Sequence, residues 1–309
     1  MAIDIIAHRA ASGFLPEHTK EALVLSFMQG ADYIEQDLVV TKDNQLVVLH
    51  DIYLENVTDV ESVFPKRVRE DGRWYAVDFT LSELRQLRVH ERENNQKLRV
   101  YAQRYQGHAH FTIASFEEHI ELIQSLNYSF DKQVGIYPEI KAYHWHLSEG
   151  KDISQLLFNI LKKHQLNSAD ARIFVQSFEP AVLKRLRFDM GAKFKMTQLL
   201  ASNSWDLNQV DYELLTSDEG LRNIASYAQA IGPWIPKVID INTDTSTGLV
   251  QRAQKHGLAV HPFTFRSDVI NQAMPADVAF SRLQALGLDG IFTDHVMPYM
   301  LHKPKEPEL

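Results

Sequence analysis

The sequence of 309 residues contains no cysteine. Disulfide bonds, thiolate catalysis and thiolate zinc sites are therefore excluded. The lack of cysteine does not identify a compartment, because a protein of an oxidising compartment can also do without disulfides. No continuous apolar segment approaches the roughly 20 residues of a transmembrane helix. The first residues, MAIDIIAHRA, lack a charged region followed by a long apolar one, so we expect no signal peptide in the chain as given. Either the protein is cytoplasmic or a leader has been removed.

An excess of positive charge is also missing, since the formal net charge is −8. This balance argues against a general nucleic-acid or anionic-membrane binder, which carries a basic surface. A small anionic substrate held by a few local cations is still compatible with it. The chain has no Walker-type glycine loop, which argues against a nucleotide hydrolase.

Two strand-like segments joined by a tight turn contain the most informative residues. Glu35 and Asp37 are two apart in the segment 33–40, so their side chains share one face of a strand. A turn over 41–46 predicts an antiparallel pairing with 41 opposite 46, 39 opposite 48, and Asp37 opposite His50. Two carboxylates and an imidazole would then meet on an otherwise apolar strand, where carboxylates need a cation or a catalytic task.

Short apolar segments alternate with amphipathic ones along most of the chain, which predicts a parallel sheet covered by helices. Strands are expected at 3–7, 33–40, 46–50, 134–140, 172–176, 194–200, 238–241, 258–265 and 289–293. Helices are expected at 19–29, 80–88, 115–126, 152–164, 180–188, 219–230, 246–256 and 276–286. About eight such units predict an α/β protein with a distorted (β/α)8 TIM barrel, whose working residues stand at the carboxyl ends of the strands. One strand segment is left over, so we expect it outside the regular ladder.

Residues 52–112 have no strand–helix rhythm and are rich in charge and aromatic residues. We therefore expect one catalytic domain over 1–309, with 52–112 as an inserted subdomain over the barrel mouth.

Two further pairs of residues stand at predicted strand ends. His8 and Arg9 end the first strand; a lone histidine there is often structural, but an adjacent arginine suits phosphate or carboxylate binding. Glu139 and Lys141 share a face at the end of another strand. They form either a solvated ion pair or part of a site. Phe263 lies in a strand near the end of the chain, where it belongs to the core or to an apolar wall for a substrate.

Taken together, these residues suit phosphoryl-ester chemistry. Glu35, Asp37 and Glu139 supply hard oxygen ligands, which favour Mg²⁺ or Ca²⁺ over zinc. Two histidines can exchange protons near neutral pH. Two cations are available to hold an anion, and a divalent cation would stabilise charge that develops on it.

The ordered motifs along the chain resemble the glycerophosphodiester phosphodiesterase family, and most closely its bacterial periplasmic type. The matching segments are His8-Arg9, Ala11-Ser12-Gly13, Leu15 to Thr19, Gly30 to Val39, Leu46 to Asp51, Gly135 to Ala142, Val260 to Thr264 and Gly290 to Asp294. They span almost the whole chain in order and with the right spacing, so the set is specific although each motif alone is modest.

The resemblance implies a role for each candidate residue. One divalent cation is expected on Glu35, Asp37 and Glu139, with Ca²⁺ expected for the periplasmic type and Mg²⁺ elsewhere. His8 and His50 would form the general acid and base pair. The substrate-binding set would be Arg9 and Lys141 on the phosphate, with Phe263 at the wall.

The resemblance also implies a substrate, a route and a compartment. Family enzymes cleave glycerophosphodiesters such as glycerophosphocholine to glycerol 3-phosphate and an alcohol, and a cyclic phosphate intermediate is expected. The partner is then a small molecule, and stable membrane insertion is not expected. The periplasm is the implied compartment, with the cytoplasm as the alternative.

The sequence departs from the family pattern at two places. Ala10 stands where the opening motif usually has glycine, and a residue with a Cβ disfavours a positive φ there. The closing motif reads Thr293-Asp294-His295-Val296 in place of the common Thr-Asp-Phe-Pro, which we expect to affect barrel closure more than chemistry. Two alternatives stay open: a related barrel phospholipase D or lyase acting on intact lipid, and a non-catalytic binding protein of the same fold.

Overall fold

Strands and helices alternate along the computed structural model, which describes residues 3–94, 96–99, 105, 107, 109–240, 243, 245–268 and 276–297. The strands are β1 (Asp4–Ala7), β2 (Tyr33–Val40), β3 (Leu46–Val48), β4 (Gly135–Ile140), β5 (Phe174–Ser177), β6 (Lys195–Leu200), β7 (Ala230–Pro233), β8 (Ile239–Asp240), β9 (Thr245–Ser246), β10 (Ala259–Val260) and β11 (Gly290–Thr293). The helices are α1 (Lys20–Met28), α2 (Val60–Val63), α3 (Leu81–Leu84), α4 (Phe116–Phe130), α5 (Tyr143–Ser148), α6 (Ile153–Lys163), α7 (Pro180–Lys184), α8 (Tyr212–Leu215), α9 (Asp218–Ala225), α10 (Leu249–Lys255) and α11 (Ala276–Ala285).

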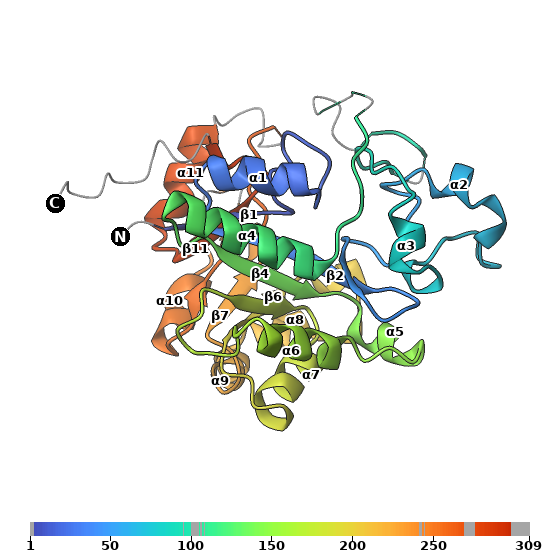
Figure 1. The fold of residues 1–309 in the computed structure, drawn as a ribbon. Helices are drawn as coiled ribbons and strands as arrows, with labels where there is room; N and C mark the ends of the chain where they lie inside the picture. Colours follow the sequence, from blue (N-terminus) through green and yellow to red (C-terminus); the bar gives the residue numbers. More distant parts are fainter. Residues whose placement is uncertain are drawn as a thin grey trace.

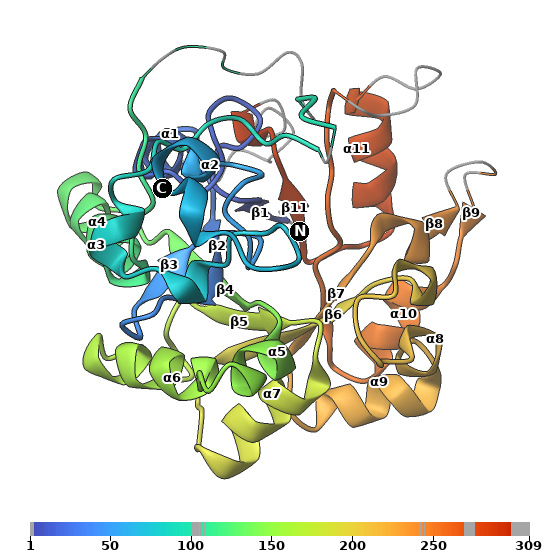
Figure 2. The same cartoon turned by 90° about the vertical axis from the view of Figure 1, so that its right-hand side faces the viewer.

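Eight parallel strands of the described chain form the predicted TIM barrel. They run in the order β10-β7-β6-β5-β4-β2-β1-β11, and β3 pairs with β2 outside this path. The two ends of the sheet approach each other beyond β10, where Phe265 bridges Thr293 and its N–H donates to the carbonyl of Phe292 at 2.8 Å. Helices surround the strands (Figures 1 and 2). No helix in the described ranges is long and apolar enough to cross a membrane.

Three apolar layers hold the fold together. Aromatic side chains fill the barrel interior, where Tyr33, Tyr137, Phe174 and Phe292 pack together. A second and larger layer lies between the strands and the surrounding helices. A third cluster joins the β2–β3 hairpin to the segment that follows it, through residues such as Val47, Trp74, Phe79, Leu84 and Phe111. This segment, with α2 and α3, lies apart from the ring of helices in Figure 1.

The seventh barrel strand is not the one that the sequence predicts. β7 (Ala230–Pro233) lies between β6 and β10, whereas the apolar segment 238–241 contains β8, which pairs with β9 in a separate two-stranded sheet. Ala-Ile-Gly-Pro looks like a turn because glycine and proline weaken a strand. Here Gly232 is needed for packing, since a Cβ at this position would lie 2.6 Å from Cδ2 of Leu199 on β6.

The β2–β3 hairpin is antiparallel as expected, but its register is shifted by one residue. Val40 pairs with Leu46 and Leu38 with Val48. The loop has three residues, closed by a bond from the N–H of Thr41 to the carbonyl of Gln45 at 2.9 Å, and Asn44 has φ 60°. Such loops combine a turn with one left-handed residue.

This register places Leu49 opposite Asp37, because the N–H of Leu49 donates to the carbonyl of Asp37 at 2.8 Å. The prediction that His50 lies directly across from Asp37 is therefore wrong. β3 ends at Val48, so His50 follows after the chain has left the ladder. The side chain of His50 lies at the barrel mouth because the loop after β3 places it there, not because His50 pairs with β2.

Candidate active site

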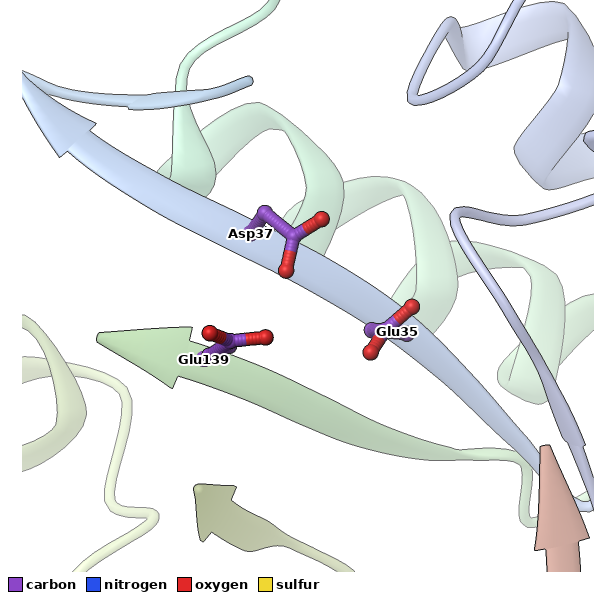
Figure 3. A group of neighbouring side chains, drawn as sticks. All are labelled: Glu35, Asp37 and Glu139. Atoms are coloured by element: carbon purple, nitrogen blue, oxygen red, sulfur yellow. The ribbon is translucent and has the colours of Figure 1, made fainter. Parts of the chain in front are cut away.

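Three buried carboxylates meet where β2 and β4 run side by side. Glu35 and Asp37 lie two residues apart on β2, so their side chains share one face, and the parallel register pairs Asp37 with Glu139 on β4. One oxygen from each side chain lies within 4.8 Å of those from the other two, and all three residues are buried. Figure 3 shows the three side chains on the same face of the two strands. The strand period and the register together bring these predicted ligands into one cluster.

The charges of this cluster fit a hard divalent cation. Oδ1 of Asp37 is buried and has no hydrogen-bond partner within the described ranges. Burial and the neighbouring Asp37 and Glu139 carboxylates raise the pKa of Glu35 well above its usual range. Burial raises the pKa of Glu139 to about 8, and the charge of Asp37 acts in the same direction, although Lys141 opposes the shift. Three carboxylates that resist simultaneous ionisation, with one oxygen unpartnered, make a suitable oxygen site for Mg²⁺ or Ca²⁺.

Neighbouring groups fix the orientation of these carboxylates. Nε2 of His18 donates to Oδ2 of Asp37 at 2.7 Å, and Nε2 of Gln176 donates to Oε1 of Glu35 at 2.7 Å. The backbone N–H of Arg9 donates to the other oxygen of Glu35 at 2.8 Å. Burial alone would raise the pKa of Asp37, but Lys141 and His18 lower it well below its usual range. Sequence reasoning included His18 in the family-like segment Leu15 to Thr19 but gave it no role, and missed its contact with Asp37.

His8 follows β1 and is anchored by the carboxylate of Asp294, the residue directly after the last barrel strand. Its Nδ1 donates to Oδ1 of Asp294 at 2.6 Å, and the hydroxyl of Ser12 donates to the same oxygen at 3.1 Å. The Nε2 atom of His8 is left on the cluster side, 3.8 Å from Oε2 of Glu35. Burial lowers the pKa of His8 and outweighs the opposite effect of Asp294. The closing motif departs from the family pattern only at His295 and Val296, whereas Asp294 is common to both. Sequence reasoning gave Asp294 no role, and the structure shows that it orients a candidate catalytic imidazole.

His50 is anchored in the same manner by the carboxylate of the next residue. Its Nδ1 donates to Oδ1 of Asp51 at 2.5 Å. Burial, followed by the charges of Arg9 and Lys141, lowers the pKa of His50 to about 3. Each imidazole thus has one nitrogen fixed by a carboxylate, which leaves Nε2 for proton transfer to a substrate.

The two predicted cations lie close to the cluster. Nζ of Lys141 is 2.9 Å from Oε1 of Glu139, and Nε of Arg9 is 3.8 Å from Oδ2 of Asp37. Arg9 and Ala10 have φ 53° and 66°, so both adopt the left-handed region. Ala10 therefore takes the conformation expected to require glycine, and it does so while fully buried.

All eight predicted site residues line one cavity of about 780 Å³ at the barrel mouth; they are His8, Arg9, Glu35, Asp37, His50, Glu139, Lys141 and Phe263. The carboxylates, histidines and cations give this cavity a polar half. Its other half is aromatic: Phe263 packs edge-on against Phe178 at 5.8 Å and lies 6.4 Å from Trp205, measured between ring centroids. The cavity can therefore hold a charged phosphate beside a less polar group.

Comparisons with known proteins agree with this arrangement. The family model for the "Glycerophosphoryl diester phosphodiesterase family" matches residues 8–297. A glycerophosphodiester phosphodiesterase of Haemophilus influenzae is 38% identical over 94% of the chain and 86% of that protein. One of Treponema pallidum is 34% identical over 94% of the chain and 88% of that protein.

Among solved structures, an Oleispira antarctica phosphodiesterase in complex with its product sn-glycerol-3-phosphate has a TM-score of 0.66 at 20% identity. The similarity covers 97% of this chain and 96% of that one. At 20% identity this structural similarity supports the TIM-barrel fold and no more than the fold.

Proposed function

Because the chain belongs to the glycerophosphoryl diester phosphodiesterase family and is an enzyme of that class, we propose that it hydrolyses glycerophosphodiesters such as glycerophosphocholine to sn-glycerol 3-phosphate and an alcohol. The observation that carries the proposal is a buried three-carboxylate cluster beside two carboxylate-anchored imidazoles in one cavity. The product sn-glycerol-3-phosphate bound to the Oleispira antarctica phosphodiesterase supports the same substrate class.

The proposal includes one divalent cation, Ca²⁺ or Mg²⁺. Glu35, Asp37 and Glu139 would hold it, and it would supply positive charge next to the phosphate. Arg9 and Lys141, both mostly buried at the edge of the cluster, would bind the remaining phosphate oxygens. The substrate alcohol then points toward the aromatic half of the cavity at Phe263.

His8 and His50 divide the proton transfers between them. One imidazole takes the proton of the glycerol 2-hydroxyl as its oxygen bonds to phosphorus. The other gives a proton to the leaving alcohol as the phosphorus–oxygen bond to it breaks. The cyclic phosphate that results is opened by water, with the same two groups exchanging roles, and glycerol 3-phosphate is released. Asp294 and Asp51 hold Nδ1 of the two imidazoles, so that Nε2 of each faces the substrate. The imidazole that acts as the acid enters the step as the imidazolium, and its carboxylate stabilises that positive charge.

The experiment compares glycerophosphocholine, lysophosphatidylcholine and phosphatidylcholine vesicles as substrates, each with both ions present. We expect glycerol 3-phosphate and choline to form from glycerophosphocholine, and no product to form from either intact lipid. Choline release from either intact lipid, without turnover of glycerophosphocholine, would instead identify the phospholipase D or lyase alternative. Binding of glycerophosphocholine without any product would identify a non-catalytic protein. His164→Ala serves as a control variant, because His164 pairs with Glu117 away from the cavity.

For the compartment we propose the periplasm, supported by the likeness of the sequence motifs to the periplasmic type. The cytoplasm is the alternative. Fractionation of cells that express the complete natural gene, with enzyme activity assayed in each fraction, separates the two.

A further inference from the structure

One arginine of the inserted segment contacts two carboxylates that each hold a different functional side chain. Arg92 lies in the long connection between α3 and α4, and its side chain is only 12% exposed. Its Nη1 donates to Oδ2 of Asp51 at 2.6 Å. Its Nε and Nη2 donate to the two oxygens of Glu17 at 2.9 and 2.6 Å. The guanidinium thus binds Glu17 as a two-point fork and Asp51 with its remaining edge.

Each of these carboxylates contacts a different side chain of the candidate site. Asp51 accepts from Nδ1 of His50 at 2.5 Å, and Glu17 accepts from Nη1 of Arg9 at 3.0 Å. A continuous chain of hydrogen bonds therefore runs from His50 through Asp51, Arg92 and Glu17 to Arg9. The side chains of Glu17 and Asp51 are 4% and 18% exposed, so water screens these contacts only weakly.

The backbone on both sides of Arg92 is itself held in place. The N–H of His90 donates to the carbonyl of Val57, and that of Glu93 donates to the carbonyl of Asn56, both at 2.9 Å. The side chain of Asn56 in turn donates to Oδ2 of Asp51 at 3.0 Å, the oxygen that Arg92 also contacts. The inserted segment therefore presents Arg92 from a fixed backbone.

We propose that Arg92 is a positioning residue, which orients His50 for proton transfer and Arg9 for phosphate binding at the same time. The inserted segment would then complete the active site rather than only cover it. This inference rests on the proposed function, since it assigns roles relative to that reaction. Lysine cannot replace this arginine, because a single ammonium group cannot bind Glu17 as a fork and also reach Asp51.

The test compares Arg92→Met, Arg92→Lys and a matched control, Arg69→Met, at saturating ion concentration and over a range of glycerophosphocholine concentrations that yields kcat and KM. Arg69 lies in the same inserted segment and also bridges two carboxylates, Asp78 and Glu149, but it does not line the cavity. We expect Arg92→Met to lower kcat by about 10–100-fold and to raise KM several-fold. Arg92→Lys should lower kcat/KM at least about fivefold, whereas Arg69→Met should stay within about twofold of the wild type.

Two further variants separate positioning from simple loss of stability. Asp51→Asn should mainly lower kcat and Glu17→Gln mainly raise KM, because they interrupt the chain toward His50 and toward Arg9. In the Asp51→Asn background, Arg92→Met should lower kcat by less than about twofold more, since the path to His50 is already broken. A full multiplicative loss in the double variant would overturn the proposal, as would near-normal kcat/KM in Arg92→Met. If Arg92→Met fails to fold, near-normal kcat/KM in Arg92→Lys overturns it.

Binding of inorganic phosphate, measured by calorimetry with the divalent ion present, keeps this test distinct from that of the proposed function. If the wild type turns over no diester, the proposed function fails, and weaker phosphate binding in Arg92→Met than in Arg69→Met still supports the positioning of Arg9. Equal phosphate affinity in the two variants, or no phosphate binding by the wild type, overturns the proposal that Arg92 positions Arg9.

Discussion

Replacing Glu139 by glutamine should abolish stabilisation by the divalent ion while changing the ion-free protein little. Two unit charges 4.8 Å apart, the upper limit within the cluster, repel by about 3.5 kcal/mol at an effective dielectric constant of about 20. For the ionised form of Glu139, which dominates only above pH 8, the substitution removes two such repulsions, about 7 kcal/mol in all, and one attraction to Lys141 at 2.9 Å, about 6 kcal/mol. Below pH 8 the carboxyl is mostly protonated, and glutamine replaces one neutral group by another. These gross terms nearly cancel, so we expect the free energy of unfolding without ion to change by less than about 2 kcal/mol.

The ion, by contrast, should stabilise the wild type clearly. An ion at 100 times its dissociation constant adds about 2.7 kcal/mol, or about 5 °C in Tm for a chain of this size. Scanning calorimetry of EDTA-treated protein, with and without added Ca²⁺ or Mg²⁺, measures this shift. In Glu139→Gln it should fall below about 1 °C. Glu179→Gln, which alters another buried glutamate of the same cavity, should keep it.

The pH dependence of ion binding follows from the same cluster. The pKa of Glu139 is about 8 without an ion, so below pH 8 a proton competes with the cation for this carboxylate. The apparent affinity of the wild type should therefore fall as the pH drops from 8 to 6, with release of protons on binding. A full ion-induced shift in Glu139→Gln, or wild-type affinity that does not depend on pH, would refute this ligand assignment.

The remaining predictions concern three residues. His50→Ala should lower kcat by at least about 100-fold while the ion-induced Tm shift survives, and a near-normal kcat would remove His50 from the mechanism. His119 is buried, with a pKa lowered to about 3 by burial and by nearby His18, and both ring nitrogens lack hydrogen-bond partners within the described chain. As the pH falls below about 6.5, the imidazole of His119 is protonated in the unfolded chain but not in the folded one, so the folded state loses stability. His119→Leu should remove about 2 kcal/mol of that loss at pH 5, as measured by urea unfolding. An equal loss of stability in the wild type and the variant would contradict this prediction. Ala10→Gly relieves about 1–2 kcal/mol of left-handed strain but loses a buried methyl of about 0.8 kcal/mol and raises unfolded-state entropy. Its urea midpoint should therefore barely move, and stabilisation above about 2 kcal/mol would mean that the strain term is underestimated.

The parts of the site predicted from sequence are those governed by local periodicity. Glu35 and Asp37 lie two apart in a long strand, so their common face follows from strand geometry whatever the rest of the fold does. The barrel follows from the repeated strand and helix units. The shifted hairpin register shows the limit of this reasoning, because one left-handed residue, Asn44, changes every opposing pair.

The contacts that orient the site residues join positions far apart in the sequence, which a local sequence pattern cannot predict. Asp294 meets His8 from 286 positions away, and Arg92 meets Glu17 from 75 positions away. His18 reads as part of a helix start, since Thr19 does cap α1, yet its side chain turns toward Asp37. The missed strand β7 is short and contains glycine and proline, so its strand character comes from pairing with its neighbours rather than from its own propensity.

The most direct test of the central claim is release of glycerol 3-phosphate from glycerophosphocholine by EDTA-treated protein, before and after addition of Ca²⁺ or Mg²⁺. We expect no turnover in EDTA and restored turnover with at least one of the two ions. Turnover that is unaffected by EDTA would contradict a role for the carboxylate cluster as a cation site. No product with either ion would contradict the proposed function itself.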